Sequence, residues 1–206
     1  MKKLVLLFPI FATSAFAQPY QIVIFRHAEK VPAVGFVRNM DALLNAQGQQ
    51  RAAYLVNFLL QNQIIDQKAH PIGGIYVPRS YVKDPRGTYN YVRCTQTIIP
   101  LFHEASACLK ETQHKNVAIH NQFSYAEANQ VIPHLMKQPF NGQTVVICWE
   151  HTEMPKLLVE QFENLKNSFP DIGEDEYDKV WVIRFDGNEP TALTFTQVKS
   201  DGFNNP

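Results

Sequence analysis

Two short stretches of the 206-residue chain combine side chains that can hold and transfer an anionic group. Arg26 and His27 directly follow an apolar run, and Glu150 and His151 directly follow another. The planar guanidinium of arginine suits phosphate oxygens, and a neutral imidazole supplies a nucleophilic nitrogen near neutral pH. Arg26 and His27 together are therefore candidates to bind and attack a phosphoryl group. An isolated Arg-His pair is a weak signal, so the rest of the sequence has to decide.

Five segments in a fixed order resemble the motifs of the histidine phosphatase (phosphoglycerate mutase-like) superfamily. They are Ile22 to Lys30 (IVIFRHAEK), Leu44 to Ala52 (LNAQGQQRA), Ile75 to Val77, Arg93 to Thr97 (RCTQT) and Val145 to His151 (VVICWEH). The matches cover roughly residues 20 to 160, and their shared order makes a chance match a poor explanation.

The resemblance implies a role for each matched residue. His27 attacks phosphorus and becomes a phosphohistidine, Arg26 and Arg93 clamp the phosphoryl oxygens, and His151 donates a hydrogen bond to the transferring group. Phosphoryl transfer mostly requires positioning and positive charge around the equatorial oxygens, and these residues supply both without a metal. The expected activity is hydrolysis of a small phosphomonoester with no cofactor.

Three carboxylates are candidates for the general acid that protonates the leaving alkoxide. Glu127 matches the place where many members carry a carboxylate, and Glu150 and Glu153 flank the second histidine. We favour Glu127 and keep the other two open. The chain departs from the commoner pattern at two places, with Glu150 where many members have glycine before the second histidine and Ala28 where the first motif often has glycine.

The segments that position these residues predict an α/β fold. We expect a three-layer sandwich with a central, mostly parallel mixed sheet and helices on both faces. The predicted strands are Gln21 to Phe25, Ile72 to Val77, Val117 to Ile119, Thr144 to Trp149, Val180 to Phe185 and Ala192 to Val198. The turn-forming cluster at residues 186–188 predicts that the last two strands form an antiparallel hairpin.

Apolar residues at helical spacing predict helices between the strands. One begins after Asn45, which is a plausible N-cap, and a second begins near Arg93. Residues 125–136 are a candidate helix, and residues 154–165 predict another with Pro155 in its first turn. Residues 78–91 are expected to form a polar loop, and loops of this length are often functional.

The amino terminus has the pattern of a cleavable secretory signal. Lys2 and Lys3 precede a short apolar run that is followed by Ala15-Phe16-Ala17, an A-x-A cleavage pattern. Cleavage near Ala17 leaves residues 18–206 as a single domain, which we expect to be periplasmic or secreted and not membrane-bound. The chain has 19 basic and 19 acidic residues, a balance that does not predict a nucleic-acid or anionic-membrane partner. The sequence does not determine the oligomeric state.

The sequence lacks the motifs of several other classes of site. Three cysteines allow at most one internal disulfide, for which Cys94 with Cys108 is the pair to test, although packing is the favoured role for Cys94 and Cys148. The other histidines lack metal-ligand spacing, and neither a G-x-S-x-G motif nor a P-loop occurs.

Two alternatives to a phosphatase remain. A phosphomutase of the same superfamily is disfavoured for an exported protein, because phosphorylated glycolytic intermediates are cytoplasmic. A non-catalytic phosphate or phospho-ligand binding protein would keep the pocket without turnover. The presence of His27 favours the enzyme, since a binding protein has no need of a nucleophile.

Overall fold

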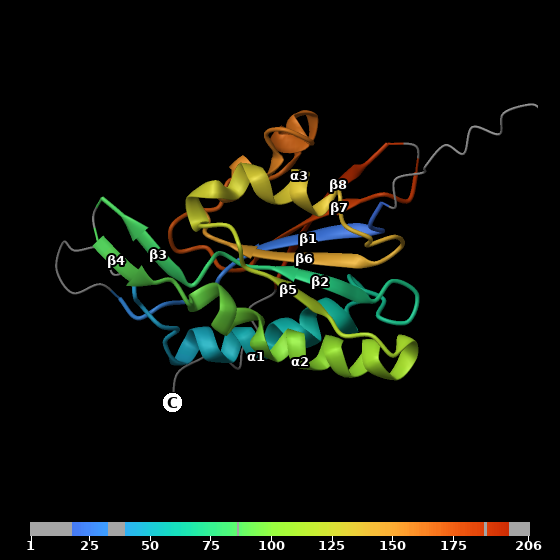
Figure 1. The fold of residues 1–206 in the computed structure, drawn as a ribbon, viewed down its shortest axis with the longest axis horizontal. Helices are drawn as coiled ribbons and strands as arrows, with labels where there is room; N and C mark the ends of the chain where they lie inside the picture. Colours follow the sequence, from blue (N-terminus) through green and yellow to red (C-terminus); the bar gives the residue numbers. More distant parts are fainter. Residues whose placement is uncertain (1–17, 33–39, 86, 188, 198–206) are drawn as a thin grey trace, which may run out of the picture.

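The computed structural model describes residues 18–32, 40–85, 87–187 and 189–197, which form a six-stranded mixed sheet covered on both faces (Figure 1). The strand order is β5-β2-β6-β1-β7-β8. The strands are β1 (Gln21–Arg26), β2 (Ile72–Tyr76), β5 (Ala118–His120), β6 (Thr144–Trp149), β7 (Lys179–Arg184) and β8 (Thr191–Thr196). Pairing is parallel from β5 to β1 and antiparallel from β1 to β8. The predicted sandwich with a mostly parallel mixed sheet is confirmed.

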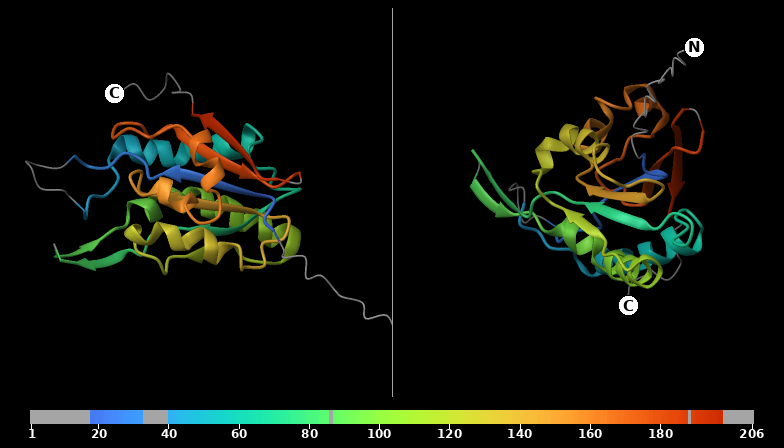
Figure 2. Two further views of the ribbon diagram at one scale, coloured as in Figure 1. Left: turned by 90° about the horizontal axis from the view of Figure 1, so that it is seen from above. Right: turned by 45° about the vertical axis from the view of Figure 1, so that its right-hand side comes forward.

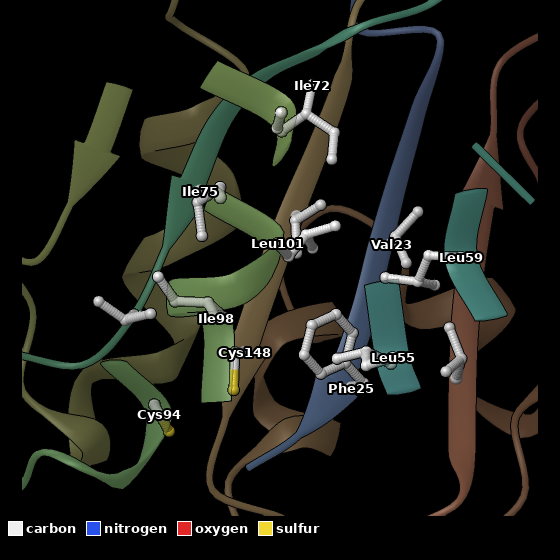
Figure 3. Close-up of a cluster of buried hydrophobic side chains, with 14 of the residues drawn as sticks. Val23, Phe25, Leu55, Leu59, Ile72, Ile75, Cys94, Ile98, Leu101 and Cys148 are labelled. Atoms are coloured by element: carbon white, nitrogen blue, oxygen red, sulfur yellow. The ribbon is translucent and has the colours of Figure 1, made fainter. Parts of the chain in front are cut away.

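The alternation of side chains along the central strands produces two cores. In β1, Val23 and Phe25 enter one cluster, while Ile22 and Ile24 enter the other, because successive side chains of a strand point to opposite faces. The helices α1 (Ala46–Gln61) and α2 (Arg93–Gln113) cover the first face, as Figures 1 and 2 show. Figure 3 shows side chains of both helices meeting those of the sheet in this core.

Short helical segments cover the second face. They are η1 (Tyr125–Gln130), α3 (Val131–Leu135), η2 (Met154–Leu158) and η3 (Glu163–Ser168). Residues 154–165, predicted to form one helix, instead form 3₁₀ turns with a break before Phe162, so that prediction is wrong in its detail. Pro155 fits the first turn of η2 as expected, but Phe162 is buried with non-helical backbone angles and ends any continuous helix.

The stretch from Pro78 to Tyr91 is not the irregular loop that its composition suggested. It contains the antiparallel hairpin β3 (Tyr81–Asp84) and β4 (Gly87–Asn90). Val82 and Tyr89 face each other across this hairpin and are buried against the first core. Their strand propensity and burial outweigh the polar residues between them. The hairpin extends beyond the end of the main sheet at which β1 terminates (Figure 1).

All three cysteines are free thiols. Cys94 and Cys148 are buried in the first core (Figure 3), which confirms the packing role. A disulfide between Cys94 and Cys108 is wrong for this fold, because both residues belong to α2. At a rise of about 1.5 Å per residue they lie about 20 Å apart along the helix, far beyond disulfide reach.

The segment after β1 is fixed to the start of α1 by several polar contacts. The carboxylate of Glu29 accepts hydrogen bonds from Nε of Arg51 at 2.8 Å, and Nη1 of Arg51 donates to Oε1 of Gln197 at 2.8 Å. Asn45 caps the helix as predicted, accepting from the amide of Gly48 at 2.8 Å. A Cβ at Gly48 would lie 2.1 Å from the carbonyl oxygen of Glu29, so only glycine permits this close approach.

Residues 1–17, on which the predicted signal peptide falls, lie outside the described residues. In the described part of the chain, none of the helices combines the length and the apolar character needed to cross a membrane.

Replacing Glu29 with glutamine should destabilise the fold strongly, because it leaves the charge of Arg51 buried without its partner. The expected loss in the free energy of unfolding is about 3 kcal/mol or more, measured by urea denaturation. The exposed pair Glu163–Lys166, whose atoms lie 3.6 Å apart, provides a control. Glu163→Gln should change stability by less than about 1 kcal/mol. Equal effects of the two variants would contradict a structural role for the Glu29–Arg51 pair.

Candidate active site

The two catalytic candidates from distant parts of the sequence lie at one edge of the sheet because their strands are parallel neighbours. Arg26 pairs in register with Trp149, and the amide of His27 donates to the carbonyl of Trp149 at 3.1 Å. Glu150 and His151 follow Trp149 directly. Ligands of open α/β sheets bind at this edge, beyond the carboxyl ends of the strands.

The tautomer of His27 follows from its contacts. Nδ1 lies 2.8 Å from the carbonyl oxygen of Ala28, which can only accept, so Nδ1 carries the proton. Nε of Arg93 donates to Nε2 of His27 at 2.9 Å. Nε2 is therefore the unprotonated ring nitrogen, and its lone pair accepts the hydrogen bond from Arg93.

Burial keeps this imidazole neutral. His27 is 1% exposed, and the pKa of His27 is well below its ordinary value, first because burial disfavours the charged ring and then because Arg93 lies beside it. A carbonyl contact and nearby Glu150 act in the opposite direction but do not outweigh these effects. Nε2 thus stays unprotonated into the acid range.

The first turn of α2 contacts the His27 segment at three points. Arg93 binds the ring of His27, Thr97 Oγ1 accepts from the amide of Ala28 at 2.9 Å, and Gln96 Oε1 accepts from the amide of Leu44 at 3.0 Å. The RCTQT motif thus has a physical explanation, because its arginine, glutamine and threonine each hold part of the loop after β1.

Arg26 is held by the segment before β7, which the sequence did not single out. Its Nη1 lies 2.9 Å from the carbonyl oxygens of Gly173 and Glu176 and 2.5 Å from that of Glu174. Tyr177 packs flat on the guanidinium, with its ring centre 3.9 Å from Cζ. Nε of Arg26 is buried and has no hydrogen-bond partner among the described residues. Since buried donors are normally satisfied, this N–H is a ready donor for a ligand oxygen.

A pocket of about 400 Å³ opens next to these residues. It is lined by Lys30, Met40, Arg93, Tyr125, Ala126, Glu150, His151, Thr152, Glu153 and Glu174. His27 and Arg26 are not among the lining residues, because both are almost fully buried behind it. Burial, followed by the charges of Arg93 and Arg26, lowers the pKa of Lys30, which places this lysine near both arginines.

Glu150 lines the pocket, and its charge acts on Arg26 and Lys30. Its Oε1 lies 2.9 Å from Nδ1 of His151, and its Oε2 accepts from the amide of Thr152 at 2.8 Å. Burial opposes the charge of Glu150, but the contacts with His151 and Thr152 outweigh it and lower the pKa to about 2. Glu150 is therefore an anion at neutral pH, next to the ring of His151.

Glu127 lies in a different setting from the other two acid candidates. Its Oε2 accepts from the amide of Ser124 at 2.7 Å in a capping box and lies 3.6 Å from Nη2 of Arg79. The hydrogen bonds from Ser124 lower the pKa of Glu127. Tyr125 and Ala126 line the pocket, whereas Glu127 does not. Glu153 does line it, and both its carboxylate oxygens accept from Nζ of Lys156.

The remaining histidines include a pair that packs around Tyr76. The ring of His120 stacks on Tyr76 with centroids 4.4 Å apart, and the hydroxyl of Tyr76 lies 3.1 Å from Nδ1 of His134. Within the described ranges, His, Cys, Asp and Glu side chains do not gather in threes as they would around a metal ion.

The strand order and the position of the site define the class of fold: the chain has a phosphoglycerate mutase-like α/β fold. Solved structures agree. It is similar to SixA of Agrobacterium tumefaciens, a proposed phosphohistidine phosphatase, with a TM-score of 0.51 and 15% identity over 81% of this chain and 92% of that one. It is also similar to SixA of Nakamurella multipartitia, with a TM-score of 0.50 and 16% identity over 86% and 96% of the two chains. No family model and no curated protein sequence matches the chain.

The lowered pKa of Glu150 predicts a pH-dependent contribution to stability. Because its folded pKa lies below the ordinary 4.5, the contribution is present above pH 4.5 and is lost as pH falls toward 2. The free energy of unfolding of the wild type minus that of Glu150→Gln should fall by about 2 kcal/mol between about pH 5 and pH 3. Urea denaturation of both proteins measures this. For the exposed control Glu111→Gln, the difference from the wild type should not change in this way with pH. If the difference between the wild type and Glu150→Gln stays constant from pH 5 to pH 3, the contacts of Glu150 do not lower its pKa.

Proposed function

We propose that the chain is a histidine phosphatase that hydrolyses a phosphomonoester through a phosphohistidine on His27. The observation that carries this proposal is the state of His27, whose Nδ1 is bound by a backbone carbonyl and whose Nε2 meets Arg93. A neutral imidazole with one free lone pair, surrounded by arginines, is suited to attack phosphorus. A buried histidine with only a packing role would not need two arginines beside it.

In the first step, Nε2 of His27 forms a bond to phosphorus while the ester P–O bond breaks. The Nε–H of Arg93 donates to the same lone pair in the structure, so a phosphoryl oxygen has to replace Nε2 as its acceptor. Nε of Arg26 supplies a second donor. His151 and Lys30 add donors at the pocket side. These groups stabilise the charge on the equatorial oxygens.

The leaving alkoxide takes a proton from a carboxylic acid, which then receives a proton from the water that attacks the phosphohistidine. The second step breaks the N–P bond, releases inorganic phosphate and returns His27 to its neutral form. The lowered pKa of Glu127 and of Glu150 favours their charged forms, which makes both poor proton donors. Glu153 lines the pocket, whereas Glu127 does not, and its partner Lys156 is exposed to solvent. We therefore assign the acid to Glu153 in place of Glu127.

The proposal includes membership of the histidine phosphatase superfamily, cleavage near Ala17 and action outside the cytoplasm, as the sequence motifs predict. It also includes independence from metals. The alternative is a phosphate receptor of the same fold. It is favoured by the lowered pKa of Glu127 and of Glu150, because charged carboxylates cannot donate the proton that turnover needs.

Removing the nucleophile should abolish turnover. With p-nitrophenyl phosphate, His27→Ala should lower kcat/KM at least about 1000-fold, whereas the exposed control His103→Ala should keep the wild-type rate. Activity should survive a chelator and persist at acid pH, because the low pKa of His27 keeps Nε2 unprotonated. Tight phosphate binding without turnover would support the receptor, and loss of turnover on chelation would support a metal hydrolase.

The leaving group identifies the acid. Nitrophenolate needs little protonation, whereas an alkoxide needs a full proton. Glu153→Gln should therefore lower kcat/KM about 100-fold or more for glycerol 2-phosphate but about tenfold or less for p-nitrophenyl phosphate. Glu127→Gln and Glu150→Gln should affect the two substrates equally. If Glu127→Gln alone shows the selective loss, the assignment to Glu153 is wrong.

A further inference from the structure

Charges of both signs line the pocket. Its basic lining residues are Lys30 and Arg93, and the charges of both Arg93 and the buried Arg26 act on Lys30. The acidic lining residues are the carboxylates Glu150, Glu153 and Glu174. In the proposed reaction the cations bind the phosphate group, which leaves these carboxylates to act on the organic part of the ester.

The three carboxylates differ in how far they are already neutralised. Glu150 contacts His151 and Thr152, and Glu153 pairs with Lys156. Glu174 is exposed, and no hydrogen bond or ion pair of its side chain occurs among the described residues. Its charge is nevertheless part of the site, since it acts on Lys30.

The segment that carries Glu174 has a fixed position and a strongly acidic composition. Backbone carbonyls of Gly173, Glu174 and Glu176 hold Arg26, and the carboxylate of Glu176 accepts from the amide of Gly173 at 2.9 Å. Residues 171–178 contain five acidic residues and no basic one, with sequence DIGEDEYD. The clamp on Arg26 therefore holds an acidic segment beside the pocket, with Glu174 among the lining residues.

An aromatic ring also lines the pocket. Tyr125 lines it and stacks on Tyr91, with centroids 5.3 Å apart and an interplanar angle of 16°. Cζ of Arg93 lies 4.1 Å from the centre of the Tyr91 ring. Aromatic faces and carboxylates are both favourable surroundings for an organic ammonium group.

From this arrangement we infer that the substrates are small phosphomonoesters whose organic part carries an ammonium group, such as phosphorylated amino alcohols or amino sugars. The inference rests on the proposed phosphatase activity and adds the charge class of the leaving group. Esters with a second anionic group are selected against, because Glu174 and the acidic segment repel them.

Three two-carbon esters separate the charge of the leaving group from its size. They are O-phosphoethanolamine, 2-hydroxyethyl phosphate and 2-phosphoglycolate, which carry an ammonium, a hydroxyl and a carboxylate group respectively. At about pH 6, where the amine is protonated, kcat/KM should fall in this order by at least about tenfold from first to last. The value of kcat/KM should likewise be higher for glucosamine 6-phosphate than for glucose 6-phosphate. This pair tests whether the preference holds when the ammonium group lies further from the phosphate. Equal rates within about twofold, or a preference for phosphoglycolate, would overturn the inference.

Glu174→Gln tests the residue that carries most of the argument. The ratio of kcat/KM for O-phosphoethanolamine to that for 2-phosphoglycolate should fall at least about threefold, and adding salt should reduce the same ratio in the wild type. Glu111→Gln, an exposed substitution on α2, should leave the ratio unchanged. An unchanged ratio in Glu174→Gln would exclude this carboxylate as the source of selectivity. If the protein is not a phosphatase, p-nitrophenyl phosphate is not hydrolysed at all, and this result can be told apart from a phosphatase that lacks the preference for ammonium esters.

Discussion

The hydrogen bond from Nδ1 of His27 to the carbonyl oxygen of Ala28 is the contact on which the site depends. It fixes the tautomer, and the tautomer decides which ring nitrogen keeps its lone pair. The carbonyl is itself held in place, because the amide of Ala28 donates to Thr97. A change in this short loop would therefore alter the protonation pattern of the ring as well as its position.

The arrangement of the sheet explains why so few residues are needed at the site. Strands β1 and β6 run parallel and end together, which places the two histidine-bearing turns side by side without long loops. The first turn of α2 then reaches the same point from one face, and the pocket lies against η1 and η2 on the other. Rigid elements thus hold the charged side chains, as a preorganised electrostatic site requires.

Much of this arrangement could be predicted from the sequence, because it depends on periodicity and on motifs in order. The strand from Gln21 to Phe25, which extends one residue further to Arg26 in the structure, the cap at Asn45 and the helix start near Arg93 follow from local residue types. The clamp on Arg26 could not be predicted, since backbone carbonyls of residues 173–176 make it and carbonyls leave no sequence signature. The hairpin at Val82 and Tyr89 was missed because its burial comes from tertiary packing. The capping role of Glu127 was missed, although Ser124 three residues earlier gives the S-x-x-E pattern of a capping box.

The contact between Arg51 and Gln197 joins residues 146 positions apart. Bringing segments this far apart together carries a loop-closure entropy cost that the rest of the fold has to offset. Gln197 directly follows β8, so the network of Glu29 and Arg51 is complete only when this edge strand is docked on the sheet. The segment that follows His27 is in this way coupled to the far end of the polypeptide, and loss of β8 from the sheet would remove one of its supports.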